Sequence, residues 1–311
     1  MNNRILAAIR SQPWAIMPEY LDAIEAIAMR AIDHPSLAHV EADGHEQRYI
    51  SALAQMGSPL TSTKTVMFRN GVASMPVFGP LIPRGSGPNV SAPLTSLDTL
   101  AKDFRAISEV PEVHAILMVF DTPGGHVTDI RSFADMIASS KIPVHGHITG
   151  DCASGGYWVG SQCKKLTIDP TGRAGSIGVM VGGRHQEETD SDGCRDINII
   201  SSNAPNKRVD ITTEEGQANI RAMLDGIEEI FLKDVARGRG VSVSTVKQDF
   251  GAGGILTGRQ AKEAGLVDQV EAGGLEAVLN RLSKPARTVT PRRAAAALSN
   301  EVAQLRAASN L

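Results

Sequence analysis

Between residues 66 and 149 the chain alternates short apolar runs with amphipathic stretches, and this alternation restricts the folds open to it. The runs HAILMVF (114–120) and PVHGHIT (143–149) have the length of buried strands, and helices are predicted over 96–108, where Ser96 is the cap, and over 129–139. Strands that are apolar throughout must be covered on both faces, as in a mostly parallel sheet flanked by helices. The sequence therefore predicts an α/β fold.

Further elements are predicted on both sides of this region. The stretch 66–79 reads as a hairpin around Asn70-Gly71, because that dipeptide tolerates the positive φ of a tight hairpin turn. An amphipathic helix is predicted over 18–33, followed by a polar linker over 34–64. Three more strands are predicted over 164–170, 175–181 and 195–201. They are followed by a long helix over 213–236 and a helix-rich closing segment over 257–271.

Composition limits the size and the partners of this fold. The chain has 311 residues, of which 42% are hydrophobic, and this suffices for one large α/β domain with appendages. We expect an N-terminal helix and linker over 1–64, the main domain over 65–282 and a basic, alanine-rich tail over 283–311. A net charge of -3 produces no field that attracts polyanions, so nucleic acid is not expected as a partner.

Cysteine count and apolar runs indicate the compartment. Three cysteines without paired metal-type spacing are typical of a reducing environment. No window reaches the roughly 18 apolar residues that a membrane span requires, and the short N-terminal apolar run is broken by Arg10 and Pro13. We therefore expect neither secretion nor a membrane anchor.

A single serine, Ser154, stands among small residues in GDCASGGYW (150–158), directly after the strand predicted at 143–149. In open α/β sheets, functional groups gather at the carboxyl ends of the strands, where this serine is placed. Two roles remain open for it. Serine can cap the helix that follows by accepting from free backbone amides, or it can be a nucleophile presented on a turn.

A serine nucleophile needs a base to remove its proton. No histidine is obviously placed for this, and His145 and His147, which share one strand face, lack the third ligand that a zinc site needs. The alternative base is a lysine with a neutral amine, and Lys207 in SSNAPNKRVD is the candidate, although a solvated loop charge is the ordinary role of such a lysine. We expect no metal and no cofactor.

Two glycine-containing turns are candidates for binding a developing negative charge. DTPGGH (121–126) follows a predicted strand and can expose backbone amides to an oxyanion, although it can equally be a plain strand-to-helix turn. Gly155 and Gly156 raise the same possibility, because the amide after a nucleophile is a common second oxyanion donor.

In their order along the chain, DTPGG, ASGGY, GSIGV, a lysine in a polar loop and GLVD resemble the signal-peptide-peptidase (SppA) family of Ser-Lys serine peptidases. The resemblance covers roughly residues 65 to 275 and implies a ClpP/crotonase-type fold of stacked β-β-α units. It implies that Ser154 is the nucleophile, Lys207 the general base and Ser176 the serine that orients the lysine amine. The amides of Gly125 and Gly155 would form the oxyanion hole.

One branch of the family fits the remaining sequence better than the membrane-anchored enzymes. QPWAIMPEYLDAIEAI (12–27) resembles the leader helix of phage head-maturation proteases, a branch that includes the minor capsid protein C of lambda-like phages. SNAPNKRVDI resembles that branch's lysine loop, with Lys-Arg-Val-Asp-Ile in place of the usual Lys-Val-Asp-Gly-Asn-Pro. About 30 residues follow the predicted domain, so we expect any scaffold to be a separate chain or product.

The resemblance thus implies a serine endopeptidase that processes a phage prohead or capsid scaffold. Its partners would be a peptide or protein substrate, such as a scaffold or portal protein, and further copies of itself in a ring. Substrate would lie extended along a strand edge near 123–127. The helices at 18–33 and 213–236 are candidate interfaces, and the expected location is the cytoplasm or the prohead interior.

Three other interpretations remain open. The chain can be a bacterial SppA-like enzyme that degrades signal peptides, a crotonase-type acyl-CoA enzyme, or a catalytically silent capsid assembly protein. An acyl-CoA enzyme needs no Ser-Lys pair, so its activity would survive replacement of Ser154 by alanine. A silent assembly protein would form no acyl-enzyme with a serine-directed probe.

Overall fold

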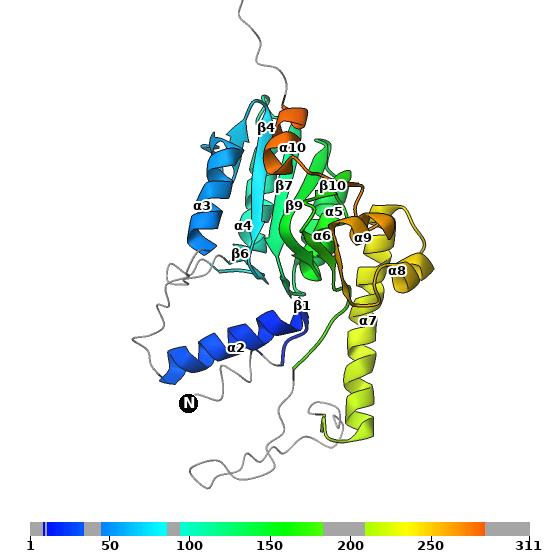
Figure 1. The fold of residues 1–311 in the computed structure, drawn as a ribbon. Coiled ribbons are helices and arrows are strands. Elements are labelled where there is room, and N and C mark those ends of the chain that lie inside the picture. Colours follow the sequence, from blue (N-terminus) through cyan, green and yellow to red (C-terminus); the bar gives the residue numbers. More distant parts are fainter. Residues whose placement is uncertain (1–8, 10, 34–44, 86–93, 183–208, 284–311) are drawn as a thin grey trace, which may run out of the picture.

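The computed structural model describes residues 9, 11–33, 45–85, 94–182 and 209–283 (Figure 1). Within these ranges the elements follow one another as β1 (Trp14–Ile16), α2 (Pro18–Asp33), α3 (His45–Met56), β2 (Ser58–Pro59), β3 (Met67–Arg69), β4 (Val72–Phe78), β5 (Leu81–Ile82), β6 (Thr95–Ser96), α4 (Leu97–Ile107), β7 (Ala115–Thr122), β8 (Gly124–His126), α5 (Ile130–Ala138), β9 (Val144–Ala153), α6 (Gly155–Gly160), β10 (Lys165–Ile168), β11 (Arg173–Gly175), α7 (Glu214–Arg239), α8 (Val243–Asp249), β12 (Ile255–Thr257), α9 (Gly258–Glu263), β13 (Gln269–Val270) and α10 (Gly274–Leu282).

Three parallel strands form the centre of the main sheet. β7 pairs with β4 on one side and with β9 on the other. Beyond β9, the sheet continues in parallel through β10 to β13 and through β11 to the antiparallel β12; beyond β4 it continues through the antiparallel β3 and β2. The predicted α/β fold with a mostly parallel sheet is confirmed. The predicted hairpin is the β3–β4 turn, where Asn70 and Gly71 have φ of 50° and 83°.

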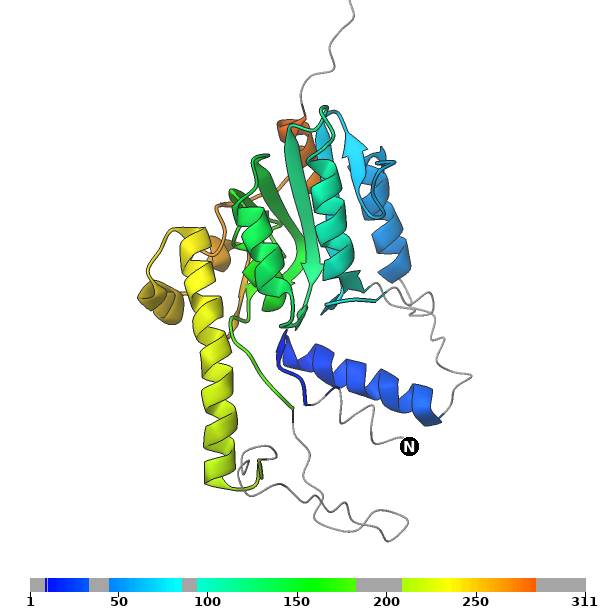
Figure 2. The ribbon, with the colours of Figure 1, turned by 180° about the vertical axis from the view of Figure 1, so that it is seen from behind.

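Both faces of this sheet are covered, as the apolar strands require. In β7, Ile116, Met118 and Phe120 belong to the principal core, to which α4 and α5 contribute their apolar faces. The alternate residues Leu117 and Val119 belong to a second core with residues of α3 and α10. Figure 1 shows α3 and α10 on one side of the sheet, and Figure 2 shows α4 and α5 on the other. Successive residues of β7 thus alternate between the two cores, as expected of a strand that is buried on both faces.

The centre of the molecule is built from repeated β-β-α units. One unit is β4, β5 and α4, with β6 leading into the helix, and the next is β7, β8 and α5. The short second strands form a separate sheet of order β1-β8-β5-β6, in which β5 and β8 run parallel through the pair Leu81 and Gly125. The stacked units implied by the ClpP/crotonase-type resemblance are therefore present. This second sheet carries the DTPGGH turn.

Two sequence predictions are wrong within the described residues. Part of the predicted linker is the helix α3, whose Ala52, Leu53 and Met56 recur at three-and-four spacing and pack in the second core. Its polar composition concealed this stripe. The strand predicted at 175–181 ends at Gly175, because Gly175 and Ser176 have φ of 127° and 52°, which extended strands do not adopt.

The long helices agree with their predicted positions. α2 has the predicted bounds, and Ser96 caps α4 by accepting from the Thr99 amide at 3.4 Å. α7 begins after Thr213 and runs three residues further than expected, to Arg239, where Gly240 ends it at φ 66°. The strand predicted at 195–201, Lys207 and all but the first residue of the tail at 283–311 lie outside the described residues. The division at residues 64 and 282 stays a prediction.

In the described part of the chain, no helix combines the length and the apolar character needed to cross a membrane.

An ion pair joins the end of α7 to the segment before β13 and leads to a pH prediction. Arg239 Nη2 lies 2.8 Å from Asp268 Oδ1, and the Leu166 amide donates to Asp268 Oδ2 at 2.6 Å. Burial raises the pKa of Asp268, but these bonds outweigh it and hold the pKa below its usual range. The folded pKa is lowered, so the stabilisation is complete above about pH 4 and is lost as the pH falls through the folded value.

We therefore expect Asp268→Asn to lower the free energy of unfolding at pH 7, by an amount that shrinks below about pH 4. Urea unfolding of both proteins between pH 7 and pH 2.5 measures this, and Asp249→Asn, at an exposed aspartate of α8, controls for the change of charge. A difference that stays constant down to pH 2.5 would contradict the assignment.

Candidate active site

Ser154 lies at the junction between the end of β9 and the start of α6. It occupies the N-cap position of α6 with φ 51° and ψ -117°, and its side chain makes no capping hydrogen bond. Its hydroxyl instead donates to the Gly178 carbonyl at 3.4 Å, and the residue is 1% exposed. The capping role that the sequence left open is therefore not the one the side chain has. A positive φ is costly for a residue with a Cβ, and such strain is concentrated at functional sites.

A bulge near the end of β9 directs the chain toward this junction. Phe120 of β7 is opposite Ile148, but Thr122 is opposite Cys152, so β9 contains two extra residues between these pairs. Gly150 lies in the bulge, where a Cβ would come 2.2 Å from Asp121 Oδ1. The same oxygen accepts from the Asp151 amide at 3.0 Å. This close packing gives the end of β9 a defined path.

Three glycines surround the backbone beside Ser154. A Cβ on Gly155 would lie 3.3 Å from the Gly125 nitrogen, so these two residues adjoin although 30 positions separate them. A Cβ on Gly124 would lie 2.9 Å from the Gly155 nitrogen. The turn before β8 is held by Thr122, whose hydroxyl donates to the Gly79 carbonyl at 2.7 Å and accepts from the Gly124 amide at 3.2 Å. Two fixed backbone amides beside a serine hydroxyl are the elements of an oxyanion site.

Ser176 reaches the same region from the neighbouring strand. Ala153 of β9 is paired in parallel with Gly175 of β11, so Ser154 and Ser176 each follow a paired residue. The Ser154 amide donates to the Gly175 carbonyl at 2.7 Å, and the Ser176 amide donates to Gly254 at 2.7 Å. The structure thus brings together four of the five predicted site residues, Ser154, Ser176, Gly125 and Gly155. The fifth, Lys207, lies outside the described residues.

Strand β1 is a component of this region that the sequence analysis missed. Trp14, Ala15 and Ile16 pair antiparallel with His126, Gly125 and Gly124 of β8. On its other side, Trp14 exchanges two hydrogen bonds of 2.8 Å with the backbone of Met180. The signal was the apolar run WAIM between two prolines, which has the length of a short strand.

An ion pair supports the bulge at the end of β9. Arg173 Nε and Nη2 each donate at 2.6 Å to a different oxygen of the Asp151 carboxylate, which makes the pair bidentate. Asp151 is buried, whereas the Arg173 side chain is 43% exposed. The two residues are directly opposite each other in β9 and β11. The pair therefore joins these strands two residues before Ala153 and Gly175.

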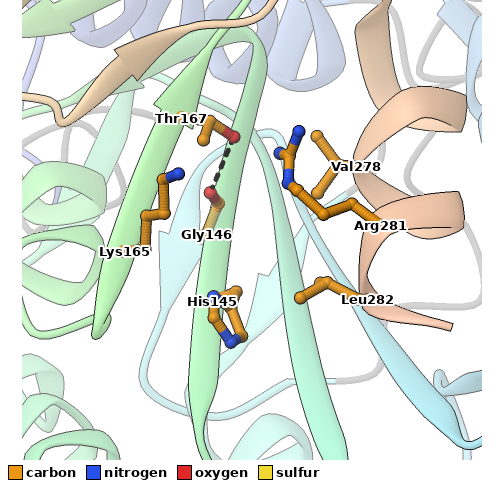
Figure 3. Close-up of a pocket in the computed structure, with 7 residues that line it drawn as sticks. All are labelled: His145, Gly146, Lys165, Thr167, Val278, Arg281 and Leu282. Atoms are coloured by element: carbon orange, nitrogen blue, oxygen red, sulfur yellow. Dashed lines mark hydrogen bonds between the residues drawn. The ribbon is translucent and has the colours of Figure 1, made fainter. Parts of the chain in front are cut away.

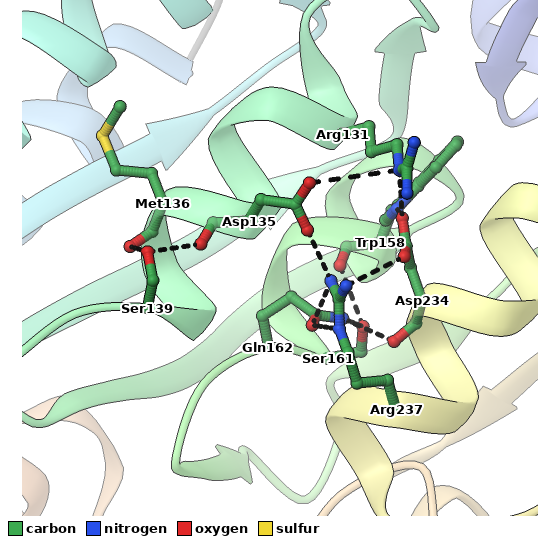
Figure 4. Close-up of polar contacts among 9 residues, drawn as sticks. All are labelled: Arg131, Asp135, Met136, Ser139, Trp158, Ser161, Gln162, Asp234 and Arg237. Atoms are coloured by element: carbon green, nitrogen blue, oxygen red, sulfur yellow. Dashed lines mark hydrogen bonds and ion pairs between the residues drawn. The ribbon is translucent and has the colours of Figure 1, made fainter.

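A partly buried polar cluster anchors α6, the helix that begins after Ser154 (Figure 4). The Trp158 indole donates to Asp234 Oδ2 of α7 at 2.9 Å and stacks on Phe231 with ring centroids 4.4 Å apart. Arg131 and Arg237 lie 3.4 Å and 3.3 Å from the same carboxylate. α6 has only six residues, so these contacts, rather than its own hydrogen bonds, hold it in place.

We expect Asp234→Ala to destabilise the protein by about 2 kcal/mol, because the indole of Trp158 is 2% exposed and would lose its acceptor. The matched control is Asp135→Ala, which removes a carboxylate that is 46% exposed from the same cluster and should cost less than about 1 kcal/mol. Chemical denaturation of the two variants tests this. Equal losses would mean that Asp234 acts only as one more surface charge.

A cavity of about 180 Å³ lies away from Ser154, at the other end of β9 (Figure 3). It is lined by His145, Gly146, Lys165, Thr167, Val278, Arg281 and Leu282. His147, on the same strand face as His145, is buried with its Nδ1 2.9 Å from Thr167 Oγ1. Among the described residues, no three His, Cys, Asp or Glu side chains are grouped to hold a metal ion.

The two described cysteines are buried free thiols. Burial raises the pKa of Cys152 well above its usual value and that of Cys163 to about 12. Cys152 is therefore not a nucleophile at neutral pH, although it stands two residues before Ser154. Cys194 lies outside the described residues.

The site has the features of a serine hydrolase: a strained serine, two adjoining amides and a second serine on the next strand. Within the described residues, no histidine is bonded to Ser154. Residues 137–289, a span that includes Ser154, Ser176 and Lys207, match the model of peptidase family S49.

Several curated proteins are similar to the chain. It is 27% identical over 206 residues to the head-tail preconnector protein GP5 of Enterobacteria phage P21, covering 65% of this chain and 41% of that protein. It is 26% identical over 208 residues to the capsid assembly protease C of Escherichia phage lambda, covering 65% and 46%. Over 189 residues it is 29% identical, covering 58% and 53%, to an Enterococcus faecium protein whose name proposes a signal peptide peptidase, SppA.

The chain spans about half the length of these curated relatives. Among solved structures, a ClpP1 mutant from Listeria monocytogenes aligns with a TM-score of 0.42 at 17% identity, covering 64% of this chain and 90% of that one. The resemblance to the SppA family, including its phage members, is confirmed by the family model and by the three curated relatives.

Proposed function

We propose that the chain is a serine endopeptidase in which Ser154 is the nucleophile and Lys207 the general base. The observation that carries the proposal is the strained conformation of Ser154 beside the adjoining backbone of Gly125 and Gly155. The capping hydrogen bond is absent, so the hydroxyl is not committed to α6, and its bond to Gly178 is long at 3.4 Å. A hydroxyl held in this way can turn toward a substrate carbonyl.

In the proposed reaction, neutral Lys207 takes the Ser154 proton as Oγ forms a bond to the peptide carbonyl carbon. The carbonyl oxygen becomes an oxyanion that accepts hydrogen bonds from the Gly125 and Gly155 amides. When the C–N bond breaks, the lysine ammonium gives its proton to the leaving amine, and an ester remains on Ser154. Water then attacks the ester and gives a proton to Lys207, and the lysine ammonium returns this proton to the Ser154 oxygen as the acid is released.

The lysine must be neutral to act as a base, which requires a desolvated position. Ser176 supports this assignment, because the register of β9 and β11 brings it beside Ser154 and its φ of 52° marks a second constrained serine. We propose that its hydroxyl orients the Lys207 amine. Ser176 is thus a positioning residue.

The proposed substrates are proteins of a phage prohead, such as a scaffold or portal protein, inside which the enzyme would act as a homo-oligomeric ring. Support comes from the two phage relatives, whose names describe a head-tail preconnector and a capsid assembly protease. α7 is a candidate subunit interface, since its Met223 and Ile230 are 43% and 39% exposed. Degradation of signal peptides is the second candidate, favoured by the Enterococcus relative.

The proposal predicts that a fluorophosphonate probe adds covalently to Ser154 in the wild type, as read by intact mass and peptide mapping. Lys207→Ala should slow the labelling at least 100-fold at pH 8, and Ser132→Ala, at an exposed serine of α5, should label like the wild type. Co-expression with a candidate scaffold then gives the cleavage site from fragment masses. An acyl-CoA enzyme or a silent assembly protein would show no labelling at Ser154.

A further inference from the structure

We propose that strand β1 (Trp14–Ile16) is an intramolecular pseudosubstrate that closes the active site, with the Ala15 carbonyl in the position of a scissile carbonyl. The inference rests on the proposed peptidase function of Ser154. The strand must leave β8 before a protein substrate can bind. The proposal therefore gives the N-terminal segment a regulatory role.

The first observation is where β1 pairs. It adds an antiparallel strand to β8, which is the glycine-rich edge beside Ser154, and the contact extends beyond β1 itself. The Met17 amide donates to the Pro123 carbonyl at 2.9 Å, and the Val127 amide donates to the Pro13 carbonyl at 3.4 Å. An extended peptide that adds to a sheet edge is a common mode of peptide binding. Here that edge already holds a segment of the same chain.

The second observation is the position of the Ala15 carbonyl. In an antiparallel ladder, hydrogen-bonded pairs alternate with non-bonded pairs, and the bonds at Pro13 and Met17 place the pair of Ala15 and Gly125 in the bonded class. The Gly125 amide proposed for the oxyanion therefore faces the Ala15 oxygen. That oxygen also lies 3.0 Å from the point where a Cβ on Gly155 would stand. The Ala15 carbonyl therefore lies beside both backbone segments proposed for the oxyanion site.

The third observation is that β1 is held from both sides. Trp14 exchanges two hydrogen bonds with Met180, four residues after Ser176, so the strand lies between the β8 edge and the segment that follows β11. The Trp14 ring also meets the His126 ring edge to face, with centroids 5.4 Å apart. A peptide bound between two backbone segments is fixed in register. A substrate would need the same two edges.

Side chains of β1 divide between two environments. The Ala15 methyl is fully buried in the principal core, whereas Trp14 and Ile16 pack with Leu21 of α2 and with Met180. A core position filled by alanine has the size of a small substrate side chain. α2 follows β1 directly and so keeps the strand beside β8 at high effective concentration.

Tethering also explains how such a strand can resist cleavage. If Ser154 attacked Ala15, the new amine of Ile16 would remain at the site, because Met17 is bound to Pro123. The amine would then re-form the peptide bond faster than water could enter, since both groups stay in place. The strand therefore inhibits rather than being consumed.

The test displaces β1 in the full chain in two independent ways. Ala15→Glu places a carboxylate in the principal core, which is unfavourable enough to expel the strand, and Ala23→Glu, on an exposed position of α2, is the matched control. The double variant Trp14→Ser, Ile16→Ser removes the packing on Leu21 and Met180, together with the Trp14 ring contact to His126 and the indole bond to the Ile9 carbonyl. It leaves the principal core intact, which covers the case that Ala15→Glu does not fold. Circular dichroism verifies the fold of each.

Fluorophosphonate labelling of Ser154 should be at least ten-fold faster in both displaced variants than in the wild type and Ala23→Glu. Measurable labelling at the same rate in all four proteins would overturn the inference. So would a wild-type mass that begins at Ile16, because β1 would then be a substrate that is consumed.

A second readout does not depend on catalysis. In a Ser154→Ala background, a fluorescent peptide with the sequence of residues 12–19 should bind the displaced variants at least ten-fold more tightly than the undisplaced protein. If it does so while no variant is labelled at Ser154, the peptidase proposal fails, and β1 covers a peptide-binding edge rather than an active site. Labelling of Ser154 that is equally fast in all variants, with equal peptide binding, would support the peptidase proposal and overturn the pseudosubstrate role of β1.

Discussion

Ser154→Ala is expected to abolish peptide hydrolysis, with a loss of at least about 1,000-fold in kcat, while the protein stays folded. The hydroxyl makes one long hydrogen bond, to Gly178, so its removal should change the free energy of unfolding by less than about 1 kcal/mol. Intact mass of a co-expressed substrate and chemical denaturation of the purified variants measure the two effects separately.

The conformation of Ser154 provides a sharper form of this test. With φ 51° and ψ -117°, position 154 suits glycine better than any residue with a Cβ. We expect Ser154→Gly to be at least as stable as the wild type and more stable than Ser154→Ala, although both are inactive. A Ser154→Gly variant that is active, or one that is much less stable than Ser154→Ala, would show that the hydroxyl or the strain has been misassigned.

The sequence predicted the central part of the fold because its signals are local. β7 is apolar on both faces, and the Asn70-Gly71 turn and the Ser96 cap each specify a local conformation. Prediction failed where tertiary contacts decide. α3 is polar overall, and its apolar stripe is recognised only once Met56 is seen to pack with residues of α10 and β4. The strand predicted at 175–181 was wrong because the positive φ of Ser176 cannot be read from its residue type.

The candidate site shows the same division. The location of Ser154 at a strand end followed from the order of elements, and the resemblance supplied the roles of Gly125, Gly155, Ser176 and Lys207. The adjacency of Gly125 and Gly155 depends on the stacking of one β-β-α unit on the next, which no local pattern reveals. β1 was missed for a related reason. A three-residue strand has almost no sequence signal, and its pairing with β8 spans more than 100 positions.

Gly155→Ala is the second change from which we expect a large effect, and it separates catalysis from stability. A methyl here would stand 3.3 Å from the Gly125 nitrogen, inside the space where the oxyanion has to fit. We expect kcat/KM to fall at least about 100-fold, as when an oxyanion-hole donor is lost. The backbone at 155 is helical with no positive φ, so alanine causes no backbone strain there and only crowds the neighbouring atoms.

The closest neighbour of that methyl is Ile130 Cδ1, at 2.6 Å, and it is the far end of a flexible side chain. Ile130→Val removes this atom, so the double variant Gly155→Ala, Ile130→Val should recover the stability lost through the clash, relative to Ile130→Val alone. It should not recover activity, because the methyl still occupies the space beside Gly125. If activity returned together with stability, crowding of α5 would explain the defect, and the Gly125 and Gly155 amides would lose their proposed role.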